Sequence, residues 1–113
     1  MFHMLTCFNL EPGVTIDEFH QSIAAFTKHL VNLKLIHARG PIGRRQSDTI
    51  MDTDAERDHQ YYFVMSFRDR AQSKQAAEHI YAHEEPGDSI HKSVFSKITD
   101  EIFICWEDVD GEW

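Results

Sequence analysis

Three segments of this chain are apolar at nearly every position, and this pattern constrains the fold more than any other feature. They span residues 2–10, 61–67 and 102–106. A strand with one face in solvent alternates apolar and polar residues, whereas a strand covered on both faces is apolar throughout. We therefore expect three strands of a sheet whose two faces are both covered.

A long helix is predicted after the first of these strands. Thr15 and Glu18 have the spacing of a capping box, in which each side chain bonds the other residue's backbone N–H. Apolar residues then recur every three or four positions up to about Lys34, at Ile16, Phe19, Ile23, Phe26, Leu30 and Leu33. This spacing is typical of a helix with one buried face.

A second helix is predicted from Arg70 to about His83, with Asp69 as its N-cap. Residues 85–88 include Pro and Gly and are expected to end it, with one or two further helical turns before a last strand at 98–106. Residues 36–46 are expected to form an irregular edge strand, because Gly and Pro interrupt them. The acidic residues 48–58 and 107–113 are expected to be a surface loop and a tail.

The order strand–helix–strand, repeated once, predicts a single ferredoxin-like α+β domain over residues 1–113. Right-handed crossovers then give a four-stranded antiparallel sheet with both helices on one face. The other face stays apolar, and a large exposed apolar patch marks an interface. We expect a second copy to cover it, forming a barrel-like homodimer.

The alternation of side chains along the strands divides these residues between the two faces of the sheet. We expect His3, Leu5 and Cys7 to share the helix-covered face with Tyr61, Phe63 and Met65. The dimer interface is then expected to contain Phe2, Met4, Phe8, Tyr62, Val64 and Trp106.

Composition narrows the classes of partner. The net charge of −8 argues against nucleic acid and against an anionic membrane surface. No apolar run approaches membrane-spanning length, and no targeting segment is visible. Cys7 and Cys105 lack metal-ligand spacing and are expected to be reduced, which suits a cytoplasmic protein. No cofactor signature is present, so we expect no cofactor.

Three motifs carry a resemblance to a known superfamily: the turn at residues 10–13, the Arg44–Arg45 pair, and residues 96–106. On these the chain resembles the dimeric α+β barrel superfamily. Within it, the chain looks like a small bacterial family without an assigned function, related to stress-responsive α/β-barrel proteins. The resemblance implies the fold and a homodimer. It does not select an activity, because the superfamily includes monooxygenases, polyketide cyclases and stress-responsive proteins.

The stress-responsive and cyclase-like relatives place a His early in strand one and a Tyr…His-Pro segment after the second helix. His3 is similar to the first feature, and residues 81–86 resemble the second, although two Glu residues separate His83 from Pro86. Tyr61 stands about where cyclase-like relatives carry a strand-three His. With His91, these residues are candidate catalytic groups that orient a phenol or carbonyl, or act as acid and base. The alternative is that His3 lies at a frayed strand end and that His83 and His91 are solvated.

Two further clusters have both a functional and a structural interpretation. His79 and His83 have the i, i+4 spacing of a helical two-His metal site, but no third ligand is fixed by spacing, so we expect no metal. Arg39, Arg44 and Arg45 lie in a stretch without acids and can bind a carboxylate or phosphate. Alternation puts Arg39 and Arg45 on one face and Arg44 on the other. The alternative is a charged edge strand that pairs with the acidic loop or tail.

Three functions remain open from the sequence. The first is a homodimer that binds a small apolar or aromatic molecule in the cleft between helices and sheet. The second is a cofactor-free enzyme, monooxygenase-like or cyclase-like, using His and Tyr. The third is a structural or regulatory dimer whose cleft is filled. A cavity beneath the helices distinguishes the third from the first two.

Overall fold

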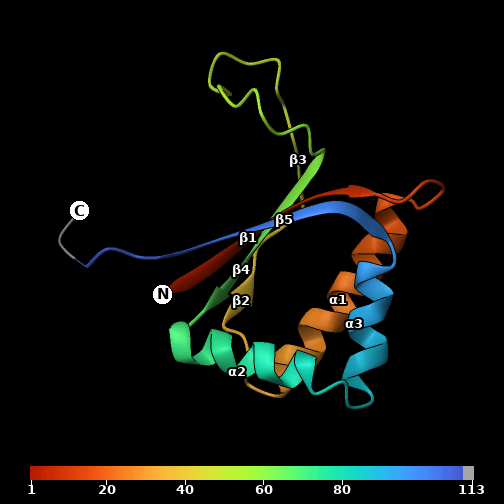
Figure 1. The fold of residues 1–113 in the computed structure, drawn as a ribbon, viewed down its shortest axis with the longest axis vertical. Helices are drawn as coiled ribbons and strands as arrows, with labels where there is room; N and C mark the ends of the chain where they lie inside the picture. Colours follow the sequence, from red (N-terminus) through yellow and green to blue (C-terminus); the bar gives the residue numbers. More distant parts are fainter. Residues whose placement is uncertain (111–113) are drawn as a thin grey trace.

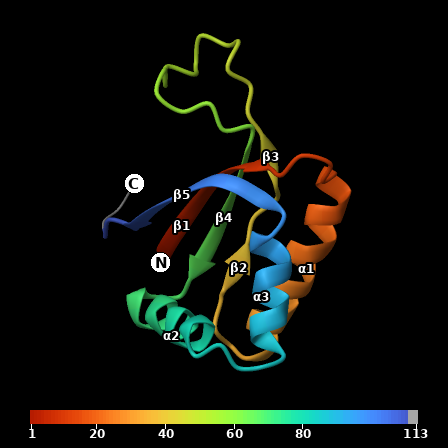
Figure 2. The ribbon, with the colours of Figure 1, turned by 45° about the vertical axis from the view of Figure 1, so that its right-hand side comes forward.

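The helices of this protein all lie on one side of a single sheet, as the computed structural model shows for residues 1–110 (Figures 1 and 2). The strands are β1 (Phe2–Leu10), β2 (Ala38–Arg39), β3 (Gly43–Arg44), β4 (Tyr61–Phe67) and β5 (Ile98–Glu107). The helices are α1 (Ile16–Asn32), α2 (Arg70–Tyr81) and α3 (Gly87–Phe95).

The sheet is antiparallel and has the order β2-β4-β1-β5, with β3 also paired to β4. This is the predicted ferredoxin-like arrangement, in which β1 is central and two crossovers place the helices on one face. The expected edge strand at 36–46 is divided into β2 and β3. The Gly40 N–H still donates to the Val64 carbonyl of β4 over 2.8 Å, but residues 40–42 form no regular strand. This agrees with the Gly and Pro residues that interrupt the segment.

The capping signals of the two predicted helices are confirmed. At α1, the backbone N–H of Glu18 donates to Thr15 Oγ1 over 3.2 Å, and the N–H of Thr15 donates to Glu18 Oε2 over 3.5 Å. At α2, the N–H of Gln72 donates to Asp69 Oδ1 over 2.8 Å. The apolar face of α1 supplies the centre of the core through Phe19, Ile23, Phe26 and Leu30.

The segment after α2 was predicted less well. The second helix ends at Tyr81 rather than His83, and α3 is a nine-residue helix where one or two turns were expected. Pro86 is the N-cap of α3, so the helix begins inside the segment that was expected to break it. Proline fits the start of a helix because no N–H is needed there. Val94 then packs into the core from α3.

The strand register corrects the predicted faces of the sheet. Phe2 pairs with Phe67, Met4 with Met65 and Phe8 with Tyr61, so even positions of β1 share a face with odd positions of β4. This face lies beneath the helices, since the fully buried Phe8 ring contacts the Phe19 ring of α1, with centroids 4.6 Å apart. Phe2, Met4 and Phe8 therefore face the helices and not a second sheet. The expectation that His3, Leu5 and Cys7 lie beneath the helices was wrong for the same reason.

The opposite face of the sheet carries no helix within residues 1–110, and it is apolar. It presents Leu5 from β1, Val64 from β4, and Ile102, Ile104 and Trp106 from β5. Trp106 is 41% exposed and Ile104 is 38% exposed. We call these five residues, with Tyr62, the open face. The predicted interface residues Tyr62, Val64 and Trp106 do lie on it.

The loop of residues 45–58, which contains the predicted acidic loop 48–58, extends from the β3–β4 end of the sheet (Figure 1) and is organised by one guanidinium. Arg45 donates from Nε and Nη2 to the Asp52 carboxylate, each over 2.9 Å, and bonds the carbonyls of Asp54 and Arg57. Cys7 is buried beside these charged groups, and burial raises the pKa of its thiol. The last residue of the acidic tail, Trp113, lies outside the described residues.

Candidate ligand-binding cleft

A cavity of about 300 Å³ lies between the three helices and the sheet. Its walls come from the even positions of β1, the odd positions of β4 and β5, and the inner faces of the helices. Apolar side chains dominate them, among them Phe2, Met4, Ile23, Phe26, Leu30, Phe63, Met65, Ala77, Ile80, Val94 and Phe103. Two of the lining residues, Phe103 and Cys105 of β5, are exposed, so the cavity reaches solvent at the β5 edge. We call this cavity the cleft.

Thr6 is the most deeply buried polar group of the cleft. The residue is 1% exposed, and its Oγ1 atom has no hydrogen-bond partner among residues 1–110. Leaving a buried hydroxyl without a partner costs about 1–3 kcal/mol. The cleft therefore contains a polar atom that a bound molecule can satisfy.

His91 supplies an imidazole to the same cleft from α3. Its ring centroid lies 4.4 Å from that of Phe95 and 5.5 Å from that of Phe26. Burial lowers the pKa of His91, an effect that the nearby Asp88 carboxylate opposes. The ring is therefore neutral at neutral pH, and a neutral imidazole offers one donor and one acceptor.

The other predicted catalytic residues do not meet His91 in the cleft. His3 lies on the side of the sheet away from the helices, where its Nδ1 is 2.8 Å from Ser66 Oγ and its Nε2 is 2.8 Å from Asp108 Oδ1. Its ring also contacts Trp106, with centroids 5.2 Å apart. Bonding to His3, together with the N-terminal amine, lowers the pKa of Asp108. His3 is thus a fixed part of that face and not a frayed strand end.

Tyr61 and His83 also lie outside the cleft. Tyr61 is on the helix side of β4, but its ring stacks on Phe8 at 5.6 Å, and the Arg44 guanidinium lies 5.8 Å from its centroid. His83 is exposed beyond the end of α2 and bonds Asp88 over 2.9 Å. Of the four residues expected to act together, the structure places only His91 in the cleft.

His79 and His83, whose spacing resembles a two-His metal site, do not lie together on one face of α2. His79 points to α1, where its Nε2 lies 2.9 Å from Nε2 of His29. His83 follows the helix end with φ of 53° and so does not continue the helical face that carries His79. No group of three His, Cys, Asp or Glu side chains within the described part of the chain is arranged to hold a metal ion.

The three arginines are divided differently from the prediction. Arg39 pairs with Met65 and Arg44 with Tyr61, so both lie on the helix side of the sheet, while Arg45 lies on the other side. Simple alternation failed because residues 40–42 interrupt the strand between Arg39 and Arg44. The bonds of Arg45 to the loop match the structural alternative for this residue.

Sequence reasoning missed Thr6, although a signal was available. Among the even positions of the first apolar segment, Phe2, Met4, Thr6 and Phe8, Thr6 is the one polar side chain. A lone hydroxyl in an apolar stripe either bonds within the core or faces a cavity. The stripe could be identified as cavity-facing only after the register had assigned it to the helix side.

Comparison with known proteins identifies relatives of the fold and not of the sequence. No family model matches the chain, and no curated protein matches it in sequence. An Arabidopsis thaliana protein is similar in structure with a TM-score of 0.71 at 11% identity, covering 100% of both chains. SnoaB, a cofactor-independent oxygenase from Streptomyces nogalater, has a TM-score of 0.67 at 9% identity over 97% of this chain and 94% of its own.

A third similar structure is a DABB-family protein with a ferredoxin-like fold from Mesorhizobium loti. It has a TM-score of 0.60 at 13% identity over 96% of this chain and 97% of its own. Several other matched structures are described as dimeric ferredoxin-like proteins of unknown function. No helix within residues 1–110 has the length and apolarity needed to cross a membrane. The chain therefore has the ferredoxin-like fold that these proteins share, and its helix–sheet cleft is its candidate site.

Proposed function

We propose that this protein is a homodimer that binds a small apolar or aromatic molecule in the cleft. The observation that carries the proposal is the unpaired hydroxyl of Thr6 inside an apolar cavity. Ligand sites combine apolar walls with a few placed polar groups, and an apolar wall with one unsatisfied hydroxyl has this composition. A ligand that bonds Thr6 Oγ1 removes the cost of leaving that atom without a partner.

The size and polarity of the cleft define the class of ligand. At about 300 Å³ the cavity is at the lower end of the volumes of small-molecule sites, which favours a molecule of one or two rings. Phe26, Phe63 and Phe103 supply aromatic surface for such rings. A phenolic hydroxyl or a carbonyl on the ligand suits Thr6 and the neutral ring of His91. An aromatic alcohol such as 1-naphthol has these properties.

The homodimer is supported by the open face. Five large apolar side chains lie there without a covering layer in the described residues, and several proteins of this fold are dimers. Two copies related by a two-fold axis would cover each other's open face with the same residues. Tyr62, Val64 and Trp106 would then lie at the interface, with Leu5, Ile102 and Ile104.

A second candidate function is cofactor-free oxygenation, which His91 favours. Its neutral imidazole can accept the proton of a bound phenol, and the phenolate is the more readily oxidised form. SnoaB shares the fold and is a cofactor-independent oxygenase. For 1-naphthol the reaction balances without a cofactor: 1-naphthol and dioxygen give 1,4-naphthoquinone and water. Dioxygen accepts four electrons. One of its oxygen atoms becomes the new carbonyl oxygen of the quinone, and the other leaves as water.

Calorimetric titration with 1-naphthol tests the binding function. Ala77 lines the cleft from α2, so Ala77→Phe fills it. Ala71 is exposed on the same helix, so Ala71→Phe is the matched control. We expect saturable binding to the wild type and to Ala71→Phe, and none to Ala77→Phe. Equal binding by both variants would place the ligand elsewhere.

Dioxygen uptake in the same samples separates the two functions. Uptake that depends on 1-naphthol and is lost in His91→Gln would support the oxygenase. Saturable binding without uptake would leave binding as the function of the cleft.

A further inference from the structure

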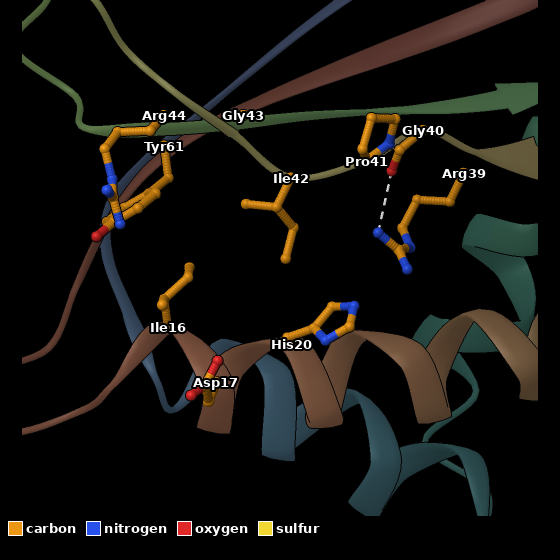
Figure 3. A pocket seen from close by; sticks show the side chains of 10 residues that line it. All are labelled: Ile16, Asp17, His20, Arg39, Gly40, Pro41, Ile42, Gly43, Arg44 and Tyr61. Carbon is orange, nitrogen blue, oxygen red and sulfur yellow. Dashed lines mark hydrogen bonds between the residues drawn. The ribbon is translucent and has the colours of Figure 1, made fainter.

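A second cavity, of about 500 Å³, lies between α1 and the β2–β3 edge of the sheet (Figure 3). Its walls are Ile16, Asp17 and His20 of α1, residues 39–44 of the edge, and Tyr61 of β4. It has no lining residue in common with the cleft. We call it the edge groove.

The edge groove contains a guanidinium that is partly buried without a counter-charge. Arg39 donates from Nε to Thr27 Oγ1 over 2.9 Å and from Nη1 to the Gly40 carbonyl over 3.0 Å, so both acceptors are neutral. Burial lowers the pKa of Arg39, which shows that its surroundings disfavour the charge. Within residues 1–110 neither Arg39 nor Arg44 forms an ion pair. A partly buried cation of this kind gains most from an anion that desolvates with it.

The remaining walls indicate an anion with an apolar body. Ile42 projects into the middle of the groove in Figure 3, between Arg39 with His20 at one end and Arg44 with Tyr61 at the other. The Asp17 carboxylate lies toward the Arg44 end in this view. The end that contains Arg39 and His20 is therefore the better place for a negative group.

We propose that the edge groove binds a small organic carboxylate. Its carboxylate contacts the Arg39 guanidinium and the His20 imidazole, and its apolar body lies against Pro41 and Ile42. Arg39 already directs two donors at the protein, which fixes the orientation of the planar guanidinium toward the ligand. The site is independent of the cleft and of any ligand bound there.

Titration of the ¹⁵N-labelled protein with benzoate tests the proposal. We expect saturable shifts of the Gly40 and Gly43 amides and of the Arg39 side-chain Nε–H resonance. Benzyl alcohol, the neutral analogue, and inorganic phosphate, an anion without an apolar body, are expected to bind at least about tenfold more weakly, since the site uses both properties. Phosphate that binds as tightly as benzoate would overturn the assignment to an organic carboxylate.

Arg39→Gln is expected to weaken benzoate binding at least about tenfold, because the charge-assisted contact to the guanidinium is lost. Arg70→Gln, on exposed α2 surface, removes the same charge and is expected to leave binding unchanged. If Arg39→Gln does not fold, His20→Gln serves instead. His20 is exposed, so its substitution should not disturb folding, and loss of the imidazole is expected to weaken benzoate binding as well. If Arg39→Gln, or His20→Gln in its place, binds benzoate as tightly as the wild type, or if the wild type shows no saturation, the proposal is overturned. Ala77→Phe is expected to retain benzoate binding, which separates this test from that of the cleft.

Discussion

The Nε2 atoms of His29 and His79 lie 2.9 Å apart where α1 meets α2, and Gly87 at the start of α3 lies against both rings. A single hydrogen between these two nitrogens bonds the rings to each other. A second proton would remove the acceptor and place two positive charges side by side. The junction of the three helices therefore depends on at least one of these histidines staying neutral.

Acidification is expected to weaken this junction before it affects the carboxylates. Burial, and then the charge of His79, lowers the pKa of His29 below its ordinary value of 6.5. Below pH 6.5 the unfolded chain binds a proton at His29 that the folded chain does not. The stability that the neutral His29–His79 pair contributes is therefore complete above pH 6.5 and declines as the pH falls. The pKa values of Asp52 and Asp88 are lowered from 3.8, so their contribution is lost only in more acidic solution.

Urea unfolding at about pH 7.5 and about pH 5.5 measures this effect, because histidine changes charge between these values. We expect the midpoint to fall on acidification in the wild type and to fall less in His79→Gln. His37→Gln, at an exposed position, is expected to behave as the wild type. The same fall in all three proteins would contradict a role for the His29–His79 pair.

Gly87→Ala is expected to destabilise the protein although alanine is the better helix former. A Cβ atom at this position would lie 2.9 Å from Nε2 of His29 and 3.0 Å from Nε2 of His79, so the two rings would have to move apart. Overpacking of this kind costs about 1–3 kcal/mol against a helix-propensity gain of about 1 kcal/mol, giving a net loss of about 1 kcal/mol. Denaturant unfolding measures it. Gly40→Ala is the control, because its Cβ would meet only the Val64 carbonyl, at 3.7 Å. A more stable Gly87→Ala protein would contradict the prediction.

Thr6→Val is expected to stabilise the free protein and to lower its affinity for the ligand. Valine has the shape of threonine and lacks the unpaired hydroxyl, so the free energy of unfolding should rise by about 1 kcal/mol or more. The affinity for 1-naphthol should fall, because the hydrogen bond to Oγ1 is lost. Chemical denaturation and calorimetry measure the two quantities on one sample.

Thr27→Val is the contrasting control for that experiment. Thr27 Oγ1 donates to the Ile23 carbonyl over 2.7 Å and accepts from Arg39 Nε, so removing it leaves partners unpaired. We expect this variant to be less stable than the wild type. If Thr6→Val is destabilised to the same degree, the hydroxyl of Thr6 is not the unpaired group that the cleft proposal requires.

The elements of this fold could be predicted where their signals are local. Thr15 with Glu18, and Asp69, mark helix starts through residues three apart, and the spacing of apolar residues shows which face of α1 is buried. The order of elements then limits the topology to very few arrangements. These predictions do not depend on which distant segments of the chain meet.

The faces of the sheet and the site depend on contacts that the sequence does not encode locally. Residues 2–10 are apolar on both faces, so a shift of one residue in register would bury an equally apolar set. The pairing of Phe2 with Phe67 decides which set faces the helices, and with it the places of His3 and Thr6. The prediction placed His3 beneath the helices because it assumed the other register. Tyr61 lies on the expected side of the sheet but outside the cleft, and His83 lies exposed beyond the end of α2.

Val64→Glu is expected to convert the proposed homodimer into a monomer. Val64 lies on the open face, on β4 beside Leu5, and a two-fold interface through this face would bury an unpaired carboxylate in each copy. Val31 is 49% exposed on α1, so Val31→Glu adds the same charge away from the open face and is the control. Sedimentation or native mass spectrometry should show a dimer for the wild type and for Val31→Glu, and a folded monomer for Val64→Glu by circular dichroism. A wild-type monomer at about 10 μM, well above the dissociation constants of stable interfaces, would contradict the homodimer. A dimer that persists in Val64→Glu would mean that the copies meet through another surface. The strongest alternative is the outer edge of β5, which pairs with no other strand within residues 1–110.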